Sequence, residues 1–99
     1  MKYKSEILPK AKVDLKNAAL WYDEKQKGLG RQLVKKFRER VGELKTNPLV
    51  CQIRYSEVHT ALVEQFPYMI HYYVDQQNKT IVIISILHTS RDPKIWFEK

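Results

Sequence analysis

The apolar residues of the first third of the chain recur at helical spacing. They follow Pro9, and they are Ala11, Leu15, Ala18, Ala19 and Tyr22. This period predicts an amphipathic helix from Pro9 or Lys10 to about Gln26, with Trp21 beside its apolar face. Proline suits the first turn of a helix, where its missing N–H has no partner to bond.

Gly28-Leu29-Gly30 then predicts a sharp reversal, because glycine accepts backbone conformations that other residues avoid. A second helix follows, with one apolar face made of Leu33, Phe37, Val41 and Leu44. Asn47-Pro48 ends it, since the residue before proline is pushed out of the helical region. Gly42 lies inside this helix at a cost of about 1 kcal/mol relative to alanine, and we expect it to allow close packing.

The remaining apolar segments have the character of strands. Tyr3–Leu8 precedes the first helix, and Ile53–Tyr55 and Val58–Phe66 follow the second. Tyr68–Asp75 alternates between two faces, and the polar segment Gln76–Lys79 predicts a turn after it. Thr80–His88 is apolar on both faces, which is typical of a central strand. A short helical turn is expected after Asp92-Pro93, where it would carry Ile95, Trp96 and Phe97.

Together these elements predict an α+β fold. An N-terminal strand and an antiparallel helical hairpin would pack on a mainly antiparallel sheet of three or four strands, with a short C-terminal helical turn. The length of 99 residues fits a single domain, residues 1–99.

Charge divides the chain into two halves. Residues 1–50 hold 13 lysines and arginines against 6 acids, whereas residues 51–99 hold 5 against 5. The whole net charge of +7 therefore belongs to the first half. Such a segment indicates either an acidic partner or an ordinary lysine-rich helix surface in solvent.

Other features limit the class of protein. The single cysteine, Cys51, excludes an internal disulfide and suits a reducing compartment. No apolar stretch follows the basic N-terminus as in a signal peptide, and Ile81–Leu87 is far shorter than a membrane span. We therefore expect a soluble cytoplasmic protein that makes no contact with a membrane.

Three groups of residues resemble the RelE/ParE superfamily of bacterial toxins. The first is Ala11-x-x-Asp14-Leu15-x-x-Ala18-x-x-Trp21-Tyr22 with Gly28-Leu29-Gly30. The second is Leu44-x-x-Asn47-Pro48. The third is Phe66-Pro67-Tyr68-x-Ile70-x-Tyr72, followed by the apolar strand and His88-x-x-Arg91-Asp92-Pro93-x-x-Trp96. They span almost the whole chain in the order that this family shows.

The resemblance implies the toxin of a type II toxin–antitoxin module, neutralised by an acidic cognate antitoxin. ParE-like members bind DNA gyrase, whereas RelE-like members enter the ribosome and cut messenger RNA. A relative without toxicity that only binds its antitoxin is a third alternative. DNA would be contacted only through the antitoxin complex.

For RNA cleavage, the candidate catalytic residues are His88 and Arg91. Histidine exchanges protons near neutral pH, and arginine binds phosphate with two hydrogen bonds. Against this role, the sheet half has no net charge, although RNA binding favours many cations. Trp96 stands where RelE-like nucleases tend to place a tyrosine, and His59 stands near the place of an arginine. His88 and Arg91 would then only end a strand and pair with an acid.

For partner binding, the candidates are the exposed cations Arg31, Lys35 and Arg38, together with Tyr73 and Trp96. The three cations and Lys45 share one face of the second helix, opposite its apolar stripe. That face either docks on an acidic surface of a partner or is an ordinary solvent-exposed face of the helix. An exposed sheet edge, or the groove beside the helices, would receive the antitoxin. The spacing of histidines and Cys51 supports no metal site, and no cofactor is predicted.

Overall fold

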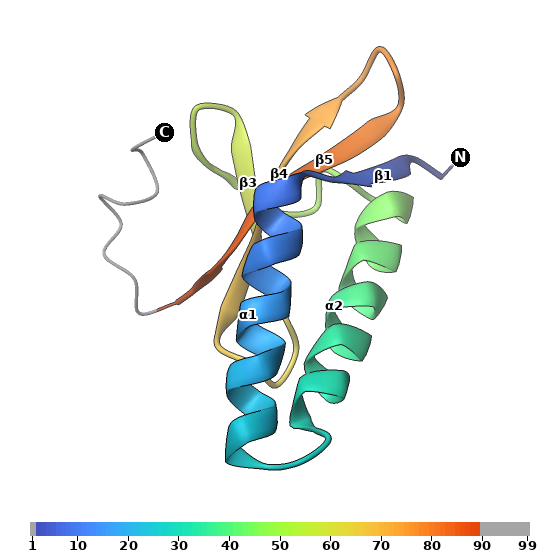
Figure 1. Cartoon of the computed structure of the whole chain (residues 1–99). Coiled ribbons are helices and arrows are strands. Elements are labelled where there is room, and N and C mark those ends of the chain that lie inside the picture. The colour runs from blue at the N-terminus through green and yellow to red at the C-terminus, as the bar shows by residue number, and fades with distance from the viewer. Residues whose placement is uncertain (1, 90–99) are drawn as a thin grey trace.

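The computed structural model describes residues 2–89, and these form two helices packed on one face of a five-stranded sheet (Figure 1). The elements follow the chain as β1 (Lys4–Ile7), α1 (Pro9–Lys25), α2 (Leu29–Thr46), β2 (Ile53–Tyr55), β3 (Val58–Leu62), β4 (Tyr68–Asp75) and β5 (Thr80–His88). The predicted α+β architecture is confirmed. The expected C-terminal helical turn and the residues Arg91 and Trp96 lie outside the described part of the chain.

The strands are ordered β1-β5-β4-β3-β2. β1 runs parallel to β5, with Lys4 opposite Thr80, and the other pairs are antiparallel. The sheet therefore has five strands and is mixed, because the N-terminal strand joins it at one edge. β5 lies between β1 and β4, which explains why it is apolar on both faces.

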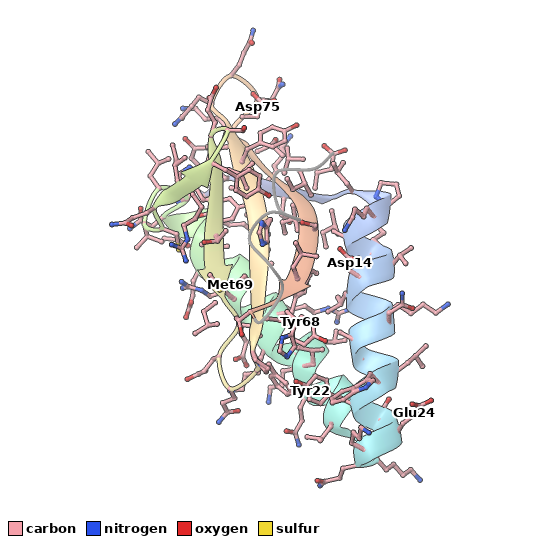
Figure 2. All side chains as sticks on the ribbon, turned by 90° about the vertical axis from the view of Figure 1, so that its left-hand side faces the viewer. Asp14, Tyr22, Glu24, Tyr68, Met69 and Asp75 are labelled. Atoms are coloured by element: carbon pink, nitrogen blue, oxygen red, sulfur yellow. The ribbon has the colours of Figure 1, made fainter. Side chains whose placement is uncertain are left out.

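The third strand is shorter than predicted. It ends at Leu62, not at Phe66, because the chain turns at Gln65, which has a φ of 71°. The amide of Phe66 donates to the carbonyl of Val63, and both side chains are buried. Phe66 thus packs into the core from a turn, where Tyr22 of α1 contacts it edge-on with ring centroids 5.1 Å apart. Tyr22 also lies near Tyr68 of β4 (Figure 2).

The core lies between the helices and the sheet. The buried residues recur at helical spacing in α2 and at every second position in the strands. They are Leu33, Phe37 and Leu44 from α2, and Ile70, Tyr72, Ile81 and Ile83 from the strands. α1 contributes mainly alanines, since only Ala11 and Ala18 are buried in it. Val13, Leu20 and Trp21 of α1 are half exposed.

Two glycines of α2 have different surroundings. Gly30 is buried against α1, where a Cβ atom would collide with the carbonyl oxygen of Ala19 and the carboxylate of Asp23. The same carboxylate accepts the Gly30 N–H at 2.8 Å, so the hairpin is closed at this residue. Gly42 is exposed, and a Cβ atom added there would meet no atom of residues 2–89 within 4 Å. The prediction of close packing within the chain at Gly42 is therefore wrong.

Candidate functional site

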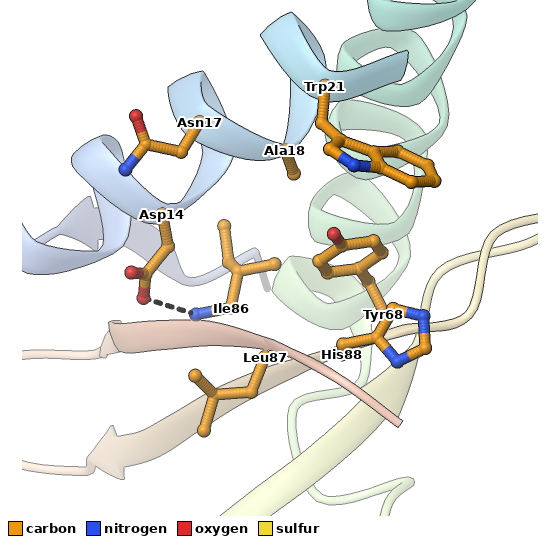
Figure 3. A pocket seen from close by; sticks show the side chains of 8 residues that line it. All are labelled: Asp14, Asn17, Ala18, Trp21, Tyr68, Ile86, Leu87 and His88. Atoms are coloured by element: carbon orange, nitrogen blue, oxygen red, sulfur yellow. Dashed lines mark hydrogen bonds between the residues drawn. The ribbon is translucent and has the colours of Figure 1, made fainter. Parts of the chain in front are cut away.

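Past the end of β1, the edge of β5 lies beside α1, and a hollow of about 380 Å³ separates them. Asp14, Trp21, Tyr68 and His88 are among the residues that line it (Figure 3). The backbone N–H of Ile86 donates to the Asp14 carboxylate at 3.1 Å, and Lys10 forms an ion pair with the same oxygen. Asp14 therefore anchors α1 to β5, and its charge is already compensated.

His88 is half-buried at the mouth of this hollow. Its ring contacts Tyr68 edge-on, with centroids 5.2 Å apart. The sequence predicted His88 and Arg91 as a catalytic pair, and the structure places only the histidine, because Arg91 lies beyond residue 89. Among residues 2–89, the charged residue that lines the hollow beside His88 is Asp14, and no lysine or arginine of this range lines it.

The sheet face turned away from the helices carries a row of polar residues. Thr60, His71 and Ser85 are cross-strand neighbours on β3, β4 and β5, and all three are buried. The hydroxyl of Tyr55 is hydrogen-bonded to Nδ1 of His71 at 2.9 Å, and Arg54 donates to Thr60. Sequence reasoning indicated His71 and Arg54 as residues of the sheet but missed Thr60 and Ser85, because the members of the row come from three strands. The sequence feature that could have indicated the row is a polar residue within each of these three apolar strands.

This face is poor in positive charge. Arg54 is the one lysine or arginine in strands β2 to β5. Burial raises the pKa of the Tyr55 hydroxyl above its ordinary value, so it stays protonated at neutral pH. The row therefore offers hydrogen bonds in a buried setting but little cation density for a polynucleotide backbone.

His59 faces the helices and has a packing role. Its ring stacks on Tyr72 with centroids 5.1 Å apart and an angle of 16° between the planes. Nδ1 of His59 is hydrogen-bonded to the carbonyl oxygen of Cys51, which fixes that nitrogen as the donor. The Tyr72 hydroxyl donates to the carbonyl of Pro48 at 2.8 Å. Both side chains therefore hold the loop between α2 and β2, and His59 supplies no cation to the open sheet face.

The outer face of α2 has the opposite character. Arg31, Lys35 and Arg38 are exposed, and none of them forms an ion pair with an acid of residues 2–89. The acids of α2 are used elsewhere, since Glu39 pairs with Lys36 and Glu43 pairs with Arg40. We call Arg31, Lys35 and Arg38 the basic stripe. The expectation that these residues share one exposed helix face agrees with the structure.

Exposed aliphatic residues gather near the edge strand β2. Leu49, Val50 and Ile53 are each more than half exposed. Leu49 and Ile53 border a second hollow of about 380 Å³ together with Tyr73, whose side chain is 40% exposed. Tyr73 is thus accessible, as expected of a binding residue, whereas the prediction for Trp96 falls outside the described residues. No pattern in the sequence indicated that these aliphatic residues would be exposed.

Neither a metal site nor a membrane span is found in the described part of the chain. Residues 2–89 contain no group of three or more His, Cys, Asp or Glu placed to bind a metal ion. No helix between these residues is both long and apolar enough to cross a bilayer. Cys51 is half-buried, and its Sγ lies 3.4 Å from a guanidinium nitrogen of Arg40.

Comparison with known proteins gives a family and a fold. Residues 6–93 match the family model described as ParE toxin of type II toxin–antitoxin system, parDE. No curated protein sequence matches the chain. Among solved structures, a chain of the chromosomal ParDE toxin–antitoxin system of P. aeruginosa is similar over 90% of this chain and 98% of its own, with 20% identity and a TM-score of 0.77.

Two further similar structures come from toxin–antitoxin complexes named RelBE. The RelBE2 complex of Mycobacterium tuberculosis has 23% identity and a TM-score of 0.63, over 89% of this chain and 99% of that one. The intact RelBE complex of E. coli has 14% identity and a TM-score of 0.69, over 90% and 99% of the two chains. At these identities the likeness establishes a shared fold.

Proposed function

The chain belongs to the ParE toxin family of type II toxin–antitoxin systems, and from that premise we propose that it inhibits growth by binding a macromolecular target such as DNA gyrase. The observation that carries this proposal is the distribution of charge. The basic stripe on α2 is exposed and forms no ion pair with an acid of residues 2–89, whereas the only lysine or arginine of strands β2 to β5 is Arg54. A surface of this kind steers an acidic partner toward the helices.

An acidic cognate antitoxin is the second partner. Solved structures of the same fold include complexes that contain an antitoxin. A disordered acidic segment that folds on binding would gain from the net charge of +7. We place the toxin in the cytoplasm, in contact with DNA only through the antitoxin complex.

RNA cleavage on the ribosome is the other candidate function. The observation that favours it is the pairing of His88 with Tyr68 beside an open hollow, together with the buried Tyr55–His71 hydrogen bond. These groups are capable of proton transfer. The scarcity of cations on the strands argues against this candidate.

Expression of the toxin alone separates the candidates. Gyrase supercoiling and messenger integrity on ribosomes are measured with the wild-type protein and with His88→Ala and Arg91→Ala. Lost supercoiling with intact messenger, unchanged in both variants, is the expected result. Messenger cleavage that disappears in these variants would instead assign the RNA-cutting function. Growth that is unaffected by the wild-type protein would point to a relative that only binds its antitoxin.

A further inference from the structure

The outer face of α1 carries large apolar side chains that the fold leaves exposed. Val13, Leu20 and Trp21 are each half exposed. Val13 and Leu20 are seven residues apart, so they lie on the same side of the helix, and Trp21 lies next to Leu20. A patch of several apolar residues on the surface of a soluble protein is typical of an interaction site, whereas single exposed residues are common everywhere.

Three polar residues complete this face. Positions 10, 13, 17, 20 and 24 follow each other at intervals of three and four, which is the spacing of a contact line between two helices. All five are exposed, and they extend over about 21 Å of helix axis. We call this line, with the adjacent Trp21, the α1 seam. Its residues are Lys10, Val13, Asn17, Leu20, Trp21 and Glu24.

The α1 seam lies away from α2. Successive residues of an α-helix are rotated by about 100°, so Asn17 and Ala19 point to nearly opposite sides. Ala19 lies against Gly30 of α2, and Figure 1 shows the two helices side by side. Asn17 and Trp21 instead border the hollow beside β5 (Figure 3). A molecule bound to the seam would therefore leave the basic stripe of α2 exposed.

The two ends of the seam carry opposite charges. Lys10 lies seven residues before Asn17, and Glu24 lies seven residues after it. In two antiparallel copies of α1 related by a twofold axis at Asn17, each Lys10 therefore faces Glu24 of the other copy. Asn17 faces its own copy, and its amide group can donate one hydrogen bond and accept another. A polar pair inside a contact between helices fixes their register.

The apolar residues match in the same arrangement. Val13 lies four residues before the axis, and Leu20 and Trp21 lie three and four residues after it. Val13 of each copy therefore falls beside Leu20 and Trp21 of the other, and the contact removes apolar surface of both copies from water. The seam is thus complementary to a reversed copy of itself in both charge and polarity.

The net charge of +7 does not prevent this contact. α1 holds four lysines and three acids, which gives only +1, whereas α2 holds six lysines and arginines against two acids. Glu24 forms no ion pair with a lysine or arginine of residues 2–89. Lys10 pairs with Asp14, but its side chain is 62% exposed and can reach a second carboxylate. The charge that repels another copy therefore lies mainly on α2, away from the seam.

We infer that two copies of this chain form a symmetric dimer through the α1 seam, with antiparallel helices and a twofold axis at Asn17. Such an interface uses the same patch on both copies, so each contact away from the axis occurs twice. The inference goes beyond the proposed function and does not depend on it. Both basic stripes stay exposed in the dimer, which offers an acidic partner two sites.

The test exchanges the charges at the two ends of the seam. Lys10→Glu or Glu24→Lys alone turns both end contacts from attraction to repulsion, so each variant should dimerise roughly tenfold more weakly than the wild type. An equimolar mixture of the two variants restores opposite charges at both contacts and should form a heterodimer as tight as the wild-type dimer. Sedimentation equilibrium measures the mass, which rises from 11.8 kDa toward twice that value on association.

Lys12→Glu is the matched control, because Lys12 is exposed on α1 but points away from Asn17. It makes the same charge change as Lys10→Glu and should dimerise as the wild type does. Both end variants should stay folded, since an acid in the first turn and a lysine in the last turn of a helix suit its dipole. Their melting temperatures check this point.

A cysteine on the axis provides an independent readout. Asn17→Cys meets its own copy in the dimer, so mild oxidation should link two chains, whereas Lys12→Cys should stay unlinked. The half-buried Cys51 is present in both variants and gives their common background.

Several results would overturn the inference. They are a wild-type chain that stays monomeric at millimolar concentration, a mixture of the end variants that stays monomeric, and an equal loss of association in Lys12→Glu. A monomeric wild type whose end variants bind the antitoxin more weakly would assign the seam to that partner and refute the dimer. Gyrase inhibition by a monomeric toxin would refute the dimer alone, and a dimer without effect on growth or gyrase would refute the proposed function alone.

Discussion

The outer face of α2 and the open face of the sheet both carry polar side chains, but they use them differently. On the sheet, Thr60 and His71 are buried, and each has a hydrogen-bond partner within the protein. On α2, Arg31, Lys35 and Arg38 are exposed, and residues 2–89 provide them with no ion pair. Thr60 and His71 therefore already form hydrogen bonds within the fold, whereas the cations of the helix remain available to a partner. Whether a polar side chain already has its hydrogen bonds or ion pairs within the protein therefore indicates more about its function than its position does.

Reversal of the basic stripe should have the largest effect. The variant Arg31→Glu, Lys35→Glu, Arg38→Glu changes the net charge from +7 to +1, since each substitution replaces a positive by a negative charge. Binding of the antitoxin should weaken roughly a hundredfold, because opposite charges become like charges across the interface. Stability should change by less than about 1 kcal/mol, since exposed cations contribute little to folding. Surface plasmon resonance and urea denaturation measure the two quantities.

The matched control reverses three exposed lysines that lie off α2: Lys12, Lys16 and Lys27. This control reaches the same net charge. A loss of affinity as large as that of the stripe variant would mean that total charge, and not the stripe, attracts the partner, and it would remove the contrast between helix and sheet.

Removal of the His59 ring should have the next largest effect, this time on stability. His59→Ala loses the stack on Tyr72 and the hydrogen bond to the loop carbonyl of Cys51. The free energy of unfolding should fall by about 2 kcal/mol, as for other buried rings with a hydrogen bond. Urea denaturation measures this change. An unchanged stability combined with lost toxicity would give His59 a functional role on the sheet and contradict the comparison.

Asp14→Ala should have a smaller effect. The substitution leaves the N–H of Ile86 without its acceptor and releases Lys10. We expect a loss of about 1–2 kcal/mol, as for a partly buried donor that loses a charged partner. Asn17→Ala, at an exposed site of the same hollow, is the control and should leave the melting temperature unchanged. Equal melting temperatures for the two variants would show that Asp14 does not anchor α1.

The smallest expected effect is a decrease in the free energy of unfolding at alkaline pH. Burial, with a further contribution from the Cys51 thiol, raises the pKa of Tyr72 well above its ordinary value, and burial raises that of Tyr55. Between the unfolded pKa near 10 and the higher folded values, the unfolded chain loses protons that the fold retains. This contribution to stability is therefore fully present below the unfolded pKa near 10 and is lost progressively as the pH rises above it.

Melting curves between pH 9 and 11 test this dependence. Tyr72→Phe should show a shallower decline than the wild type, although it is less stable at pH 7, where the phenylalanine cannot donate to Pro48. Parallel curves for the two proteins would mean that the Tyr72 hydroxyl ionises equally in both states.

Much of this fold could be predicted because its helices and long strands have clear periods. The ends of β4 and β5 agree with the sequence interpretation, α1 agrees within one residue, and α2 ends just before Asn47 as predicted. The order of the strands could not be predicted, since the pairing of β1 with β5 joins residues that are distant in the chain. Phe66 was assigned to a strand because a buried turn residue has the same apolar character as a strand residue.

The candidate site divides in the same manner. Arg31, Lys35 and Arg38 lie on one helix, so their spacing alone placed them together. Thr60, His71 and Ser85 form a row through strand register, which no local pattern encodes. The openness around Gly42 could not be predicted either, because it depends on which elements pack near α2 and which do not.

The pairing of the first strand with the last determines when the sheet can be completed during synthesis of the chain. Lys4 lies opposite Thr80, so β1 must wait for a partner made 76 residues later. At a translation rate of roughly 5–20 residues per second, that delay is about 4–15 s. The helical hairpin with its basic stripe is made first and the sheet is closed last. The basic stripe is therefore synthesised well before the sheet that it accompanies can be completed.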